Sequence, residues 1–230
     1  MAFRDLLVDV EKIDTETSVI HGIMNVSKEM NHRPLVFSNL KEAPNHSAAL
    51  NVLTRKRICE TFNVNPGELI DILAWAMNNP CEPEIIDSGS APVMENTMEK
   101  VNLEKIPIPW HYPEDRGRYQ SASVIIAQYN GIRNMSFHRQ FLRDGNHTVS
   151  RFVPRHLRTM TDLAASDGKN VDIAVVNGAD AVVLLAAAMS FTVNLDELTV
   201  AAALHQKLHG KPLKLVELSN GIQVPANAEY

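Results

Sequence analysis

Residues 131–158, GIRNMSFHRQFLRDGNHTVSRFVPRHLR, decide how the rest of the chain is interpreted. The stretch holds two Asn, two Ser, three His and six Arg among short apolar residues, which alternate imperfectly as in a strand, a turn and a second strand. Asp144-Gly145-Asn146 is a hairpin turn signal. Arginine is rarely buried without a partner, so we expect its side chains here to face an anion or a cleft. Composition alone also allows a solvated, arginine-rich surface.

A strict two-residue period divides the side chains of the first strand between two faces. The two sets are Asn134, Ser136 and His138 on one face, and Met135, Phe137 and Arg139 on the other. Only the polar set can line a site together with Asn134. Arg139 therefore needs a β-bulge or the end of the strand to reach that site.

Composition places the chain among ordinary globular proteins. Its 230 residues are 45% hydrophobic and 21% charged, enough for one sizeable core or two unequal ones. The net charge of −5 argues against general nucleic-acid binding, which usually shows a basic balance. Cys59 and Cys81 have no C-x-x-C spacing, so we expect neither a disulfide framework nor a zinc ribbon, and a reducing cytoplasm fits best.

No part of the sequence has the pattern of a signal peptide or a membrane span. The N-terminal residues, MAFRDLLVDVEKID, include acidic side chains and lack an apolar central region. The longest apolar run, residues 179–191, includes Asp180 and is too short for a bilayer. We therefore expect a soluble, cytoplasmic protein.

The N-terminal half is predicted to be rich in helix. Apolar residues recur at helical spacing in three segments, and a short strand is expected in PLVFSNL. The three expected helices cover residues 2–13, 17–31 and 48–62. The strongest helix signature is Asn65-Pro66-Gly67-Glu68 before LIDILAWAMNN: Asn65 suits the N-cap, Pro66 the first helical position and Glu68 the positive end of the helix.

A proline-rich, irregular passage over residues 80–113 suggests a subdomain boundary, and strands and helices alternate after it. Beyond the hairpin, the expected elements are a strand in SASVIIAQY, helices over 157–166, 181–189 and 194–209, and strands over 171–176, 212–218 and 222–224. We predict an α+β protein, rich in α/β pattern. Its expected units are a helix-rich N-terminal subdomain, residues 1–113, and a second domain, residues 114–230.

The motifs in residues 134–139 and 155–156 resemble the cofactor site of the UbiD family, which are decarboxylases that use prenylated FMN. By that resemblance Asn134 and His156 hold a divalent metal, usually manganese, against the cofactor phosphate, and Arg139 is catalytic. The resemblance also implies a split β-barrel flavin-binding domain with flanking helices. The cofactor-binding positions that it implies are Asn134, Ser136, Phe137, Arg139, Arg155, His156, Ala188, Met189 and Glu197.

Glu197 has two interpretations. Asn194 and Glu197 have the spacing of a capping box, which is worth about 1 kcal/mol without any metal. In the UbiD family, a small-residue stretch ending in Met precedes a Glu that binds the metal. Residues 186–189, AAAM, followed by Glu197, resemble that arrangement, and the resemblance implies Glu197 as the third metal ligand.

The ending VPANAE, residues 224–229, resembles the family's VPA-x-x-E motif, whose Glu is the acid–base residue beside the cofactor. That role maps to Glu229, which without the motif is a charged residue near a frayed terminus. The resemblance then assigns the proton that replaces carbon dioxide to Glu229, and the anchoring of the substrate carboxylate to Arg139.

The implied reaction is the reversible, non-oxidative decarboxylation of an α,β-unsaturated or aromatic carboxylic acid. No ordinary side chain accepts the electrons left on carbon, and prenylated FMN serves as the sink in the family. Ligation dominated by oxygen suits Mn²⁺ or Mg²⁺ better than zinc. A K⁺ ion held by backbone carbonyls near Ala186 and Met189 is a further family expectation.

The resemblance covers most of the chain and stops at Tyr230, whereas family members continue into a segment with a second catalytic Glu and a C-terminal domain used in closure and oligomerisation. We expect either a fragment or one half of a split enzyme, whose second chain carries the C-terminal part of a homo- or hetero-oligomer. One alternative is a flavin-binding subunit without activity of its own. Another is a metal hydrolase built on His138, His156 and Glu197, which lacks an H-E-x-x-H spacing.

Overall fold

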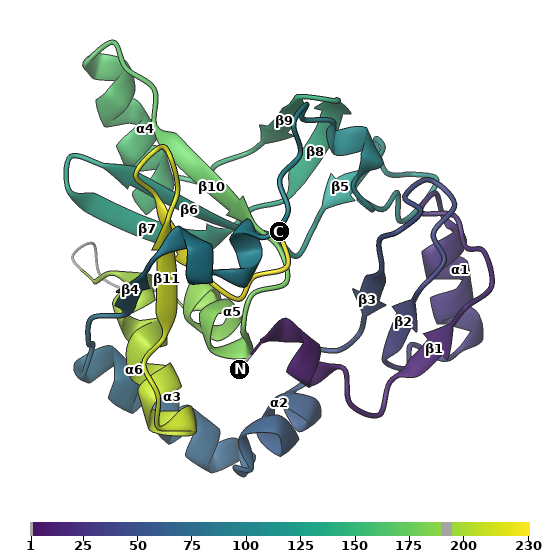
Figure 1. Ribbon diagram of the computed structural model, residues 1–230, viewed down its shortest axis with the longest axis horizontal. Helices are drawn as coiled ribbons and strands as arrows, with labels where there is room; N and C mark the ends of the chain where they lie inside the picture. Colours follow the sequence, from purple (N-terminus) through teal and green to yellow (C-terminus); the bar gives the residue numbers. More distant parts are fainter. Residues whose placement is uncertain (1, 190–194) are drawn as a thin grey trace.

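The structure, a computed structural model, describes residues 2–189 and 195–230. Four sheets of three strands each are packed with helices between and around them (Figure 1). The predicted mixed α/β class is confirmed. Within the described residues no sheet closes into a barrel. The same residues contain no helix with both the length and the apolar run needed to cross a bilayer.

A small sheet and one helix form the N-terminal end, at the right of Figure 1. β1 (Glu11–Ile13) pairs in parallel with β2 (Leu35–Phe37), and β2 pairs antiparallel with β3 (Ala48–Leu50). Helix α1 (Gly22–Glu29) packs against this sheet around a hydrophobic cluster that includes Phe37. The predicted strand in PLVFSNL is confirmed as β2.

Three of the helices predicted in this part are wrong in extent, the first two being those expected at 2–13 and 17–31. In residues 2–13 only a 3-10 turn forms, Phe3–Leu6, because Asp9 adopts a left-handed φ of 52° and the next residues pair as β1. The helix expected at 17–31 begins at Gly22, since Ser18 and Val19 donate hydrogen bonds to the Glu42 carboxylate instead.

The helix expected at 48–62 divides in the same way. Its first residues form β3, and α2 (Arg55–Phe62) begins only after Thr54, whose hydroxyl accepts the Arg57 N–H. Sheet pairing takes the first residues because β2 offers them a hydrogen-bonding edge.

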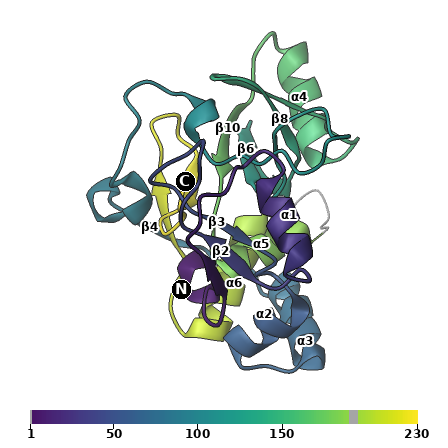
Figure 2. The same cartoon turned by 90° about the vertical axis from the view of Figure 1, so that its right-hand side faces the viewer.

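Helix α3 (Pro66–Asn78) begins as the sequence predicts. Asn65 Oδ1 accepts hydrogen bonds from the N–H groups of Gly67 and Glu68. In turn, Glu68 Oε2 accepts a hydrogen bond from the Asn65 N–H at 2.8 Å. Pro66 is the first helical residue. Figure 2 shows α2 and α3 side by side at the bottom of the molecule, where α3 packs against α6.

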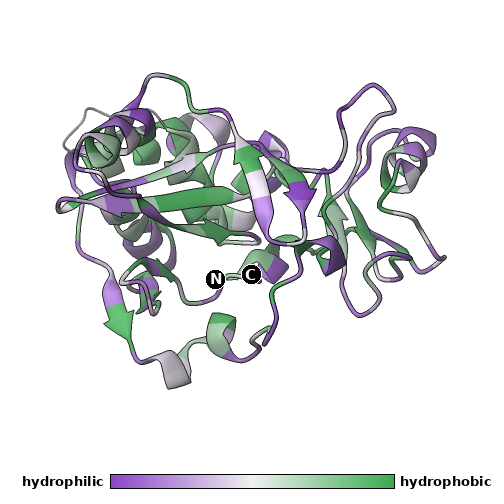
Figure 3. Ribbon diagram, turned by 90° about the horizontal axis from the view of Figure 1, so that it is seen from above, coloured by the Kyte–Doolittle hydropathy of each residue, from purple (hydrophilic) through white to green (hydrophobic). Residues whose placement is uncertain are grey.

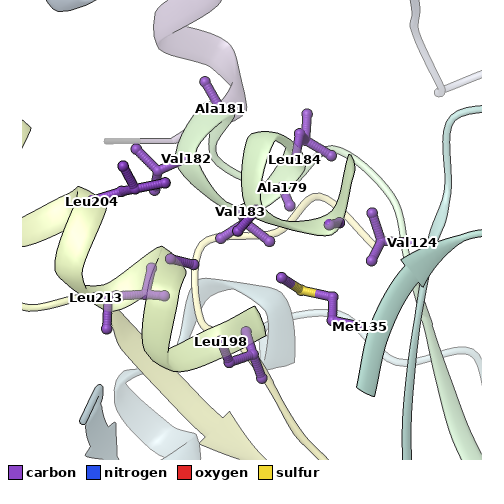
Figure 4. Packing of buried hydrophobic residues seen from close by; sticks show 14 of the residues in the cluster. Val124, Met135, Ala179, Ala181, Val182, Val183, Leu184, Leu198, Leu204 and Leu213 are labelled. Carbon is purple, nitrogen blue, oxygen red and sulfur yellow. The ribbon is translucent and has the colours of Figure 1, made fainter. Parts of the chain in front are cut away.

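The central sheet has β6 (Val124–Tyr129) between β10 (Asp172–Val176) and β7 (Ile132–Phe137), with both pairings antiparallel. Helix α4 (His156–Ser166) packs on one face through Leu157 and Met160. On the other face lie α5 (Ala181–Ala188) and α6 (Glu197–His209), toward which Val124 and Met135 point in Figure 4. In Figure 3 the apolar residues are concentrated on the strands and helices around this central sheet, at the left of the view, and hydrophilic residues predominate on the loops.

The predicted hairpin is confirmed. β8 (Gln140–Asp144) and β9 (His147–Ser150) are antiparallel on either side of the turn, and β5 (Tyr119–Gln120) adds a third strand to β8. The expected single strand before the turn is two strands, because β7 belongs to the central sheet and the chain changes sheet at His138-Arg139.

The last sheet has β11 (Lys214–Glu217) between β12 (Gln223–Pro225), antiparallel, and β4 (Glu84–Ile86), parallel. β4 lies in the proline-rich passage that was expected to be irregular, and its partner follows it by more than a hundred residues. Three further 3-10 turns lie at Ser88–Ser90, Pro92–Met94 and Leu103–Lys105.

Side chains from both halves of the chain share the main hydrophobic cluster. Phe62 and Leu69 lie in it together with Val124 and Leu204. The predicted division at residue 113 stays a prediction.

Candidate active site

β7 presents its polar side chains to the face of the central sheet that α4 covers. Asn134 lies opposite Ala127 of β6, and Ser136 lies opposite Ile125. Residues directly opposite each other in an antiparallel pair share a face, and both β6 residues pack under α4. The predicted polar face therefore forms on the side of the sheet from which α4 begins.

The polar face is joined by hydrogen bonds as the two-residue period predicts. Ser136 Oγ donates to Asn134 Oδ1 at 3.1 Å and lies 3.0 Å from His138 Nε2. Because the hydroxyl proton is directed at Asn134, His138 Nε2 must be the donor in the second contact. Burial lowers the pKa of His138, which favours the neutral ring with its proton on Nε2.

Glu197 reaches the edge of the sheet from the start of α6. Its Oε1 accepts the Asn134 Nδ2–H at 2.9 Å and its Oε2 accepts the Met135 N–H at 2.9 Å. β7 is an edge strand, so this backbone N–H would otherwise lack a partner in a buried place. The carboxylate thus covers the sheet edge and orients the amide of Asn134.

The environment of Glu197 opposes its negative charge. The side chain is 3% exposed, and burial raises its pKa to about 7. Hydrogen bonds from the Met135 and Glu197 N–H groups and from the Asn134 amide lower the pKa, but by less than burial raises it. Among the described residues, the groups that donate to this carboxylate are neutral N–H groups and none is a cation.

The start of α6 is held by two residues that the sequence interpretation missed. Asp196 is the N-cap, with Oδ1 accepting the Leu198 N–H at 2.8 Å. Its Oδ2 accepts from Arg133 Nε at 2.7 Å and lies 2.5 Å from Nη2, while Arg133 Nη1 donates to Gln223 Oε1 at 2.6 Å. Arg133 directly precedes Asn134 in β7, so this ion pair fixes the distance between strand and helix.

The predicted capping box at Asn194 and Glu197 does not describe the start of α6. Asp196 occupies the N-cap and Glu197 is the first helical residue, with its carboxylate turned to β7. Asn194 lies outside the described residues. The two adjacent acids, Asp196 and Glu197, were the available sequence signal, because only one of them is needed to cap the helix and the other can contact β7.

His156 and Arg155 come from the start of α4, where Arg155 is the N-cap. Together with Asn134 and Glu197 they line a cavity of about 820 Å³. The remaining predicted cofactor-binding residues that line this cavity are Ser136, Phe137, Ala188 and Met189. Segments of β7, α4, α5 and α6 thus meet at one hollow.

The two predicted catalytic residues lie elsewhere. Arg139 follows the end of β7 and lines an adjoining cavity of about 870 Å³, which shares Phe137, His138 and Val153 with the first. Glu229 lines neither cavity. Its carboxylate accepts hydrogen bonds from Arg4 Nε at 2.8 Å and Nη2 at 2.7 Å.

The donors around the first cavity fit a hard divalent cation. Asn134 offers an amide oxygen, Glu197 a carboxylate and His156 an imidazole, a set with more oxygen than nitrogen. Mn²⁺ and Mg²⁺ prefer such ligands. The buried, uncompensated acid among them supports this fit independently of any motif.

Comparisons with known proteins identify relatives of the chain. The family model of UbiD, described as 3-octaprenyl-4-hydroxybenzoate carboxy-lyase Rift-related domain, matches residues 84–230. Anhydromevalonate phosphate decarboxylase of Methanothermobacter thermautotrophicus is 31% identical over 198 residues, which cover 84% of this chain and 45% of the relative. The enzyme of the same name from Methanosarcina mazei is 30% identical over 233 residues, covering 98% and 52%.

Solved structures agree with these relatives. An evolved dimeric form of the UbiD-class enzyme HmfF from Pelotomaculum thermopropionicum, in complex with prFMN, superposes with a TM-score of 0.91 at 27% identity. The superposition covers 99% of this chain and 55% of that one. The chain therefore spans about half the length of the curated relatives and of this structure.

Proposed function

Because the chain belongs to the UbiD family, we propose that it forms the cofactor-binding part of a carboxy-lyase that decarboxylates an α,β-unsaturated or aromatic carboxylic acid with prenylated FMN. The chain covers about half of its relatives, so the proposal includes a second polypeptide segment that completes the enzyme, in the same or in a separate chain. Homo- or hetero-oligomerisation and a cytoplasmic location, which suits the free thiols of Cys59 and Cys81, belong to the same proposal.

One observation carries it. The amide of Asn134 and the carboxylate of Glu197 are hydrogen-bonded at 2.9 Å across 63 residues of sequence, on a cavity that His156 also lines. We infer that these three side chains hold Mn²⁺ or Mg²⁺ against the phosphate of the cofactor. Arg155, the N-cap residue of α4, adds positive charge that would bind the same phosphate.

The chemistry requires an electron acceptor because carbon dioxide leaves an electron pair behind on carbon. Prenylated FMN supplies that sink when bound. This chain's own residues bind and orient. Ser136 and His138 form a hydrogen-bonded row beside Asn134, in which the Ser136 hydroxyl donates to the Asn134 amide oxygen and so fixes the orientation of the amide. K⁺ at the carbonyls near Ala186 and Met189 remains part of the proposal.

Arg139 is the proposed anchor of the substrate carboxylate, since it lines the cavity next to the cofactor-binding one. Glu229 is the proposed proton donor. Both of its carboxylate oxygens accept hydrogen bonds from Arg4, so proton donation to a substrate requires that this contact open when the enzyme is complete. Arg4 is therefore expected to compete with catalysis in the isolated chain.

A binding experiment tests the cofactor site without requiring turnover. The untagged chain is titrated with FMN and prenylated FMN, with and without Mn²⁺, and flavin fluorescence is recorded. Glu197→Gln, which keeps the shape and removes the charge, should weaken the Mn²⁺-dependent binding about 10-fold or more. Glu217→Gln changes an exposed glutamate of β11 and should leave binding unchanged.

A second arm measures release of carbon dioxide after a polypeptide that supplies the C-terminal half of a UbiD-family enzyme is added. Turnover only in the mixture supports a split enzyme. Flavin binding without turnover in any mixture would instead support the flavin-binding subunit. Flavin binding that depends neither on Mn²⁺ nor on substitutions at Asn134, His156 and Glu197 would refute the proposal.

A further inference from the structure

A second cluster of metal-ligating side chains lies at the far ends of α5 and α6. Asp180 is the N-cap of α5, and His205 and His209 lie one turn apart near the end of α6. The other ends of both helices border the cavity at Asn134. With a rise of about 1.5 Å per residue, His205 lies about 12 Å along the helix from Glu197. The cluster is thus separate from the proposed cofactor site.

One potential ligand atom from each of the three residues lies within 4.8 Å of the other two. His205 Nε2 is 3.6 Å from Asp180 Oδ2. Ligands of tetrahedral Zn²⁺ at bond lengths of about 2.0–2.1 Å lie about 3.3 Å from one another, so a small rotation of the side chains closes the site. Histidines four residues apart project from the same face of a helix.

The ring of His205 is oriented as metal-binding histidines usually are. Its Nδ1 lies 2.8 Å from the carbonyl oxygen of Lys211, which can only accept, so Nδ1 carries the hydrogen. Nε2, the nitrogen that a metal would use, is then on the side of Asp180. A backbone carbonyl that fixes the tautomer in this way is the usual outer-shell partner of a ligating imidazole. His205 itself is only 6% exposed.

The ring of His209 offers a second, independent observation. Its Nε2 is buried and makes no hydrogen bond within the described residues. The ring packs edge-on to His205, with centroids 4.8 Å apart, and against Phe62. A buried, unbonded ring nitrogen beside a second imidazole and a carboxylate points to a ligand.

We propose that Asp180, His205 and His209 bind a borderline divalent transition metal, with Zn²⁺ as the ion of choice. Two imidazoles and one carboxylate are ligands that Zn²⁺ takes in proteins, and the nitrogen-rich set distinguishes this site from the oxygen-rich one at Asn134. Asp180 and His205 also line a cavity of about 650 Å³, from which water fills the fourth position. The metal joins the start of α5 to the end of α6.

The test is a titration of untagged, metal-free protein with Zn²⁺ against a chromophoric chelator, repeated with Co²⁺ to record the absorption of tetrahedral cobalt. One saturable site per chain and the tetrahedral cobalt spectrum are expected. His209→Ala should weaken Zn²⁺ binding about 10-fold or more. His147→Ala is the matched control, because His147 also lies beside a carboxylate, Asp144, at 2.7 Å but on an exposed hairpin.

Asp180→Asn provides a second variant in case His209→Ala does not fold, as judged by circular dichroism. It keeps an oxygen for the Val182 N–H, which Asp180 Oδ1 accepts at 2.9 Å, and removes the charge. It should also weaken Zn²⁺ binding. Native-like binding by the folded variants, loss of binding in His147→Ala alone, or the absence of a saturable site would each overturn the proposal.

The two metal sites are distinguished by crossing the variants. Glu197→Gln should retain Zn²⁺ binding and lose Mn²⁺-dependent flavin binding, while Asp180→Asn should do the reverse. Loss of both activities in either variant, with folding intact, would show that the sites are not independent and would contradict the assignment of separate ligand sets.

Discussion

The buried carboxyl group of Glu197 predicts how the metal-free chain responds to pH. Burial raises its pKa from the ordinary value of 4.5 to about 7. Between these two values the folded state keeps the proton, whereas the unfolded state has lost it. The free energy of unfolding therefore falls as pH rises through this window, by about 1.4 kcal/mol per pH unit, and the loss is complete above the folded pKa.

The perturbation is Glu197→Gln, which cannot ionise. The total effect over the window is about 3 kcal/mol, so above pH 7 the metal-free variant should be more stable than the parent by up to that amount. Gln still offers an oxygen to the Met135 N–H. The Asn134 amide must turn over to meet the new NH₂ group, and the Ser136 hydroxyl can then accept from it.

The assay is thermal unfolding followed by circular dichroism in a chelating buffer, at pH 4.5 and pH 8. For a chain of this length, about 3 kcal/mol corresponds to a Tm difference of the order of 10 °C. The difference should appear at pH 8 and disappear at pH 4.5. Mn²⁺ should raise the Tm of the parent at pH 8 and leave that of Glu197→Gln unchanged, and Glu217→Gln should follow the parent throughout.

A lower stability of Glu197→Gln than of the parent at pH 8, in the absence of metal, would refute the proposed cost of burying the ionised carboxylate. That result would mean that the ionised carboxylate stabilises the fold through its bonds to β7. The proposed requirement for a cation would then lose its physical basis, even if Mn²⁺ still bound somewhere on the chain.

Three further predictions concern the frame around the site, each measured by urea unfolding. Asp196→Ala should destabilise the chain by about 2 kcal/mol, because it removes an N-cap and leaves Arg133 without its carboxylate; an unchanged midpoint would contradict the role given to this ion pair. Gly178→Ala should cost about 1 kcal/mol or more, since φ is +64° and a Cβ would lie 2.5 Å from Glu229 Cγ; a neutral result would mean that Glu229 moves freely. Asn65→Ala should cost about 1 kcal/mol and Asn65→Gly only a few tenths, and equal losses would show that the cap is not the cause.

The elements that were predicted well from the sequence are those whose conformation is determined by interactions between residues close together in the chain. Asn65 to Glu68 satisfy the first N–H groups of α3 among themselves. The turn at Gly145-Asn146 joins two strands that are neighbours in the sequence. The same holds for Gly221, whose φ of +79° suits the turn between the neighbouring strands β11 and β12. In each case no distant partner is needed to select the conformation.

The elements that were missed depend on distant partners. β1, β3 and β4 have three residues each, too few for a periodic pattern, and each is a strand only because the edge of another strand pairs with it. β4 pairs with β11 near the other end of the chain. Apolar residues in such short segments satisfy helical spacing equally well, which explains the overextended helices before residue 62.

The predictions for the site follow the same rule: the local pattern was predicted correctly and the long-range contact was missed. The alternation in β7 predicted that Asn134, Ser136 and His138 share a face, and the row of hydrogen bonds between them confirms it. Arg133 and Asp196 are 63 residues apart, and neither belongs to a motif, so their ion pair was invisible to sequence reasoning. The roles of the predicted site residues stay predictions until binding is measured.

The placement of an acid at Glu197 is itself an argument for function. A structure that needed only hydrogen-bond partners for the Met135 N–H and the Asn134 amide would be served by a neutral glutamine, whose oxygen accepts the first and whose NH₂ group meets the turned amide. A carboxylate in this place lowers the stability of the metal-free fold at neutral pH by about 3 kcal/mol. Such a cost is typical of sites where a charge is held ready for a partner, and here the neighbouring donors, Asn134 and His156, are both able to bind a metal ion. A cation bound there would convert a buried acid that lowers the stability of the fold into one that stabilises both the sheet edge and the start of α6.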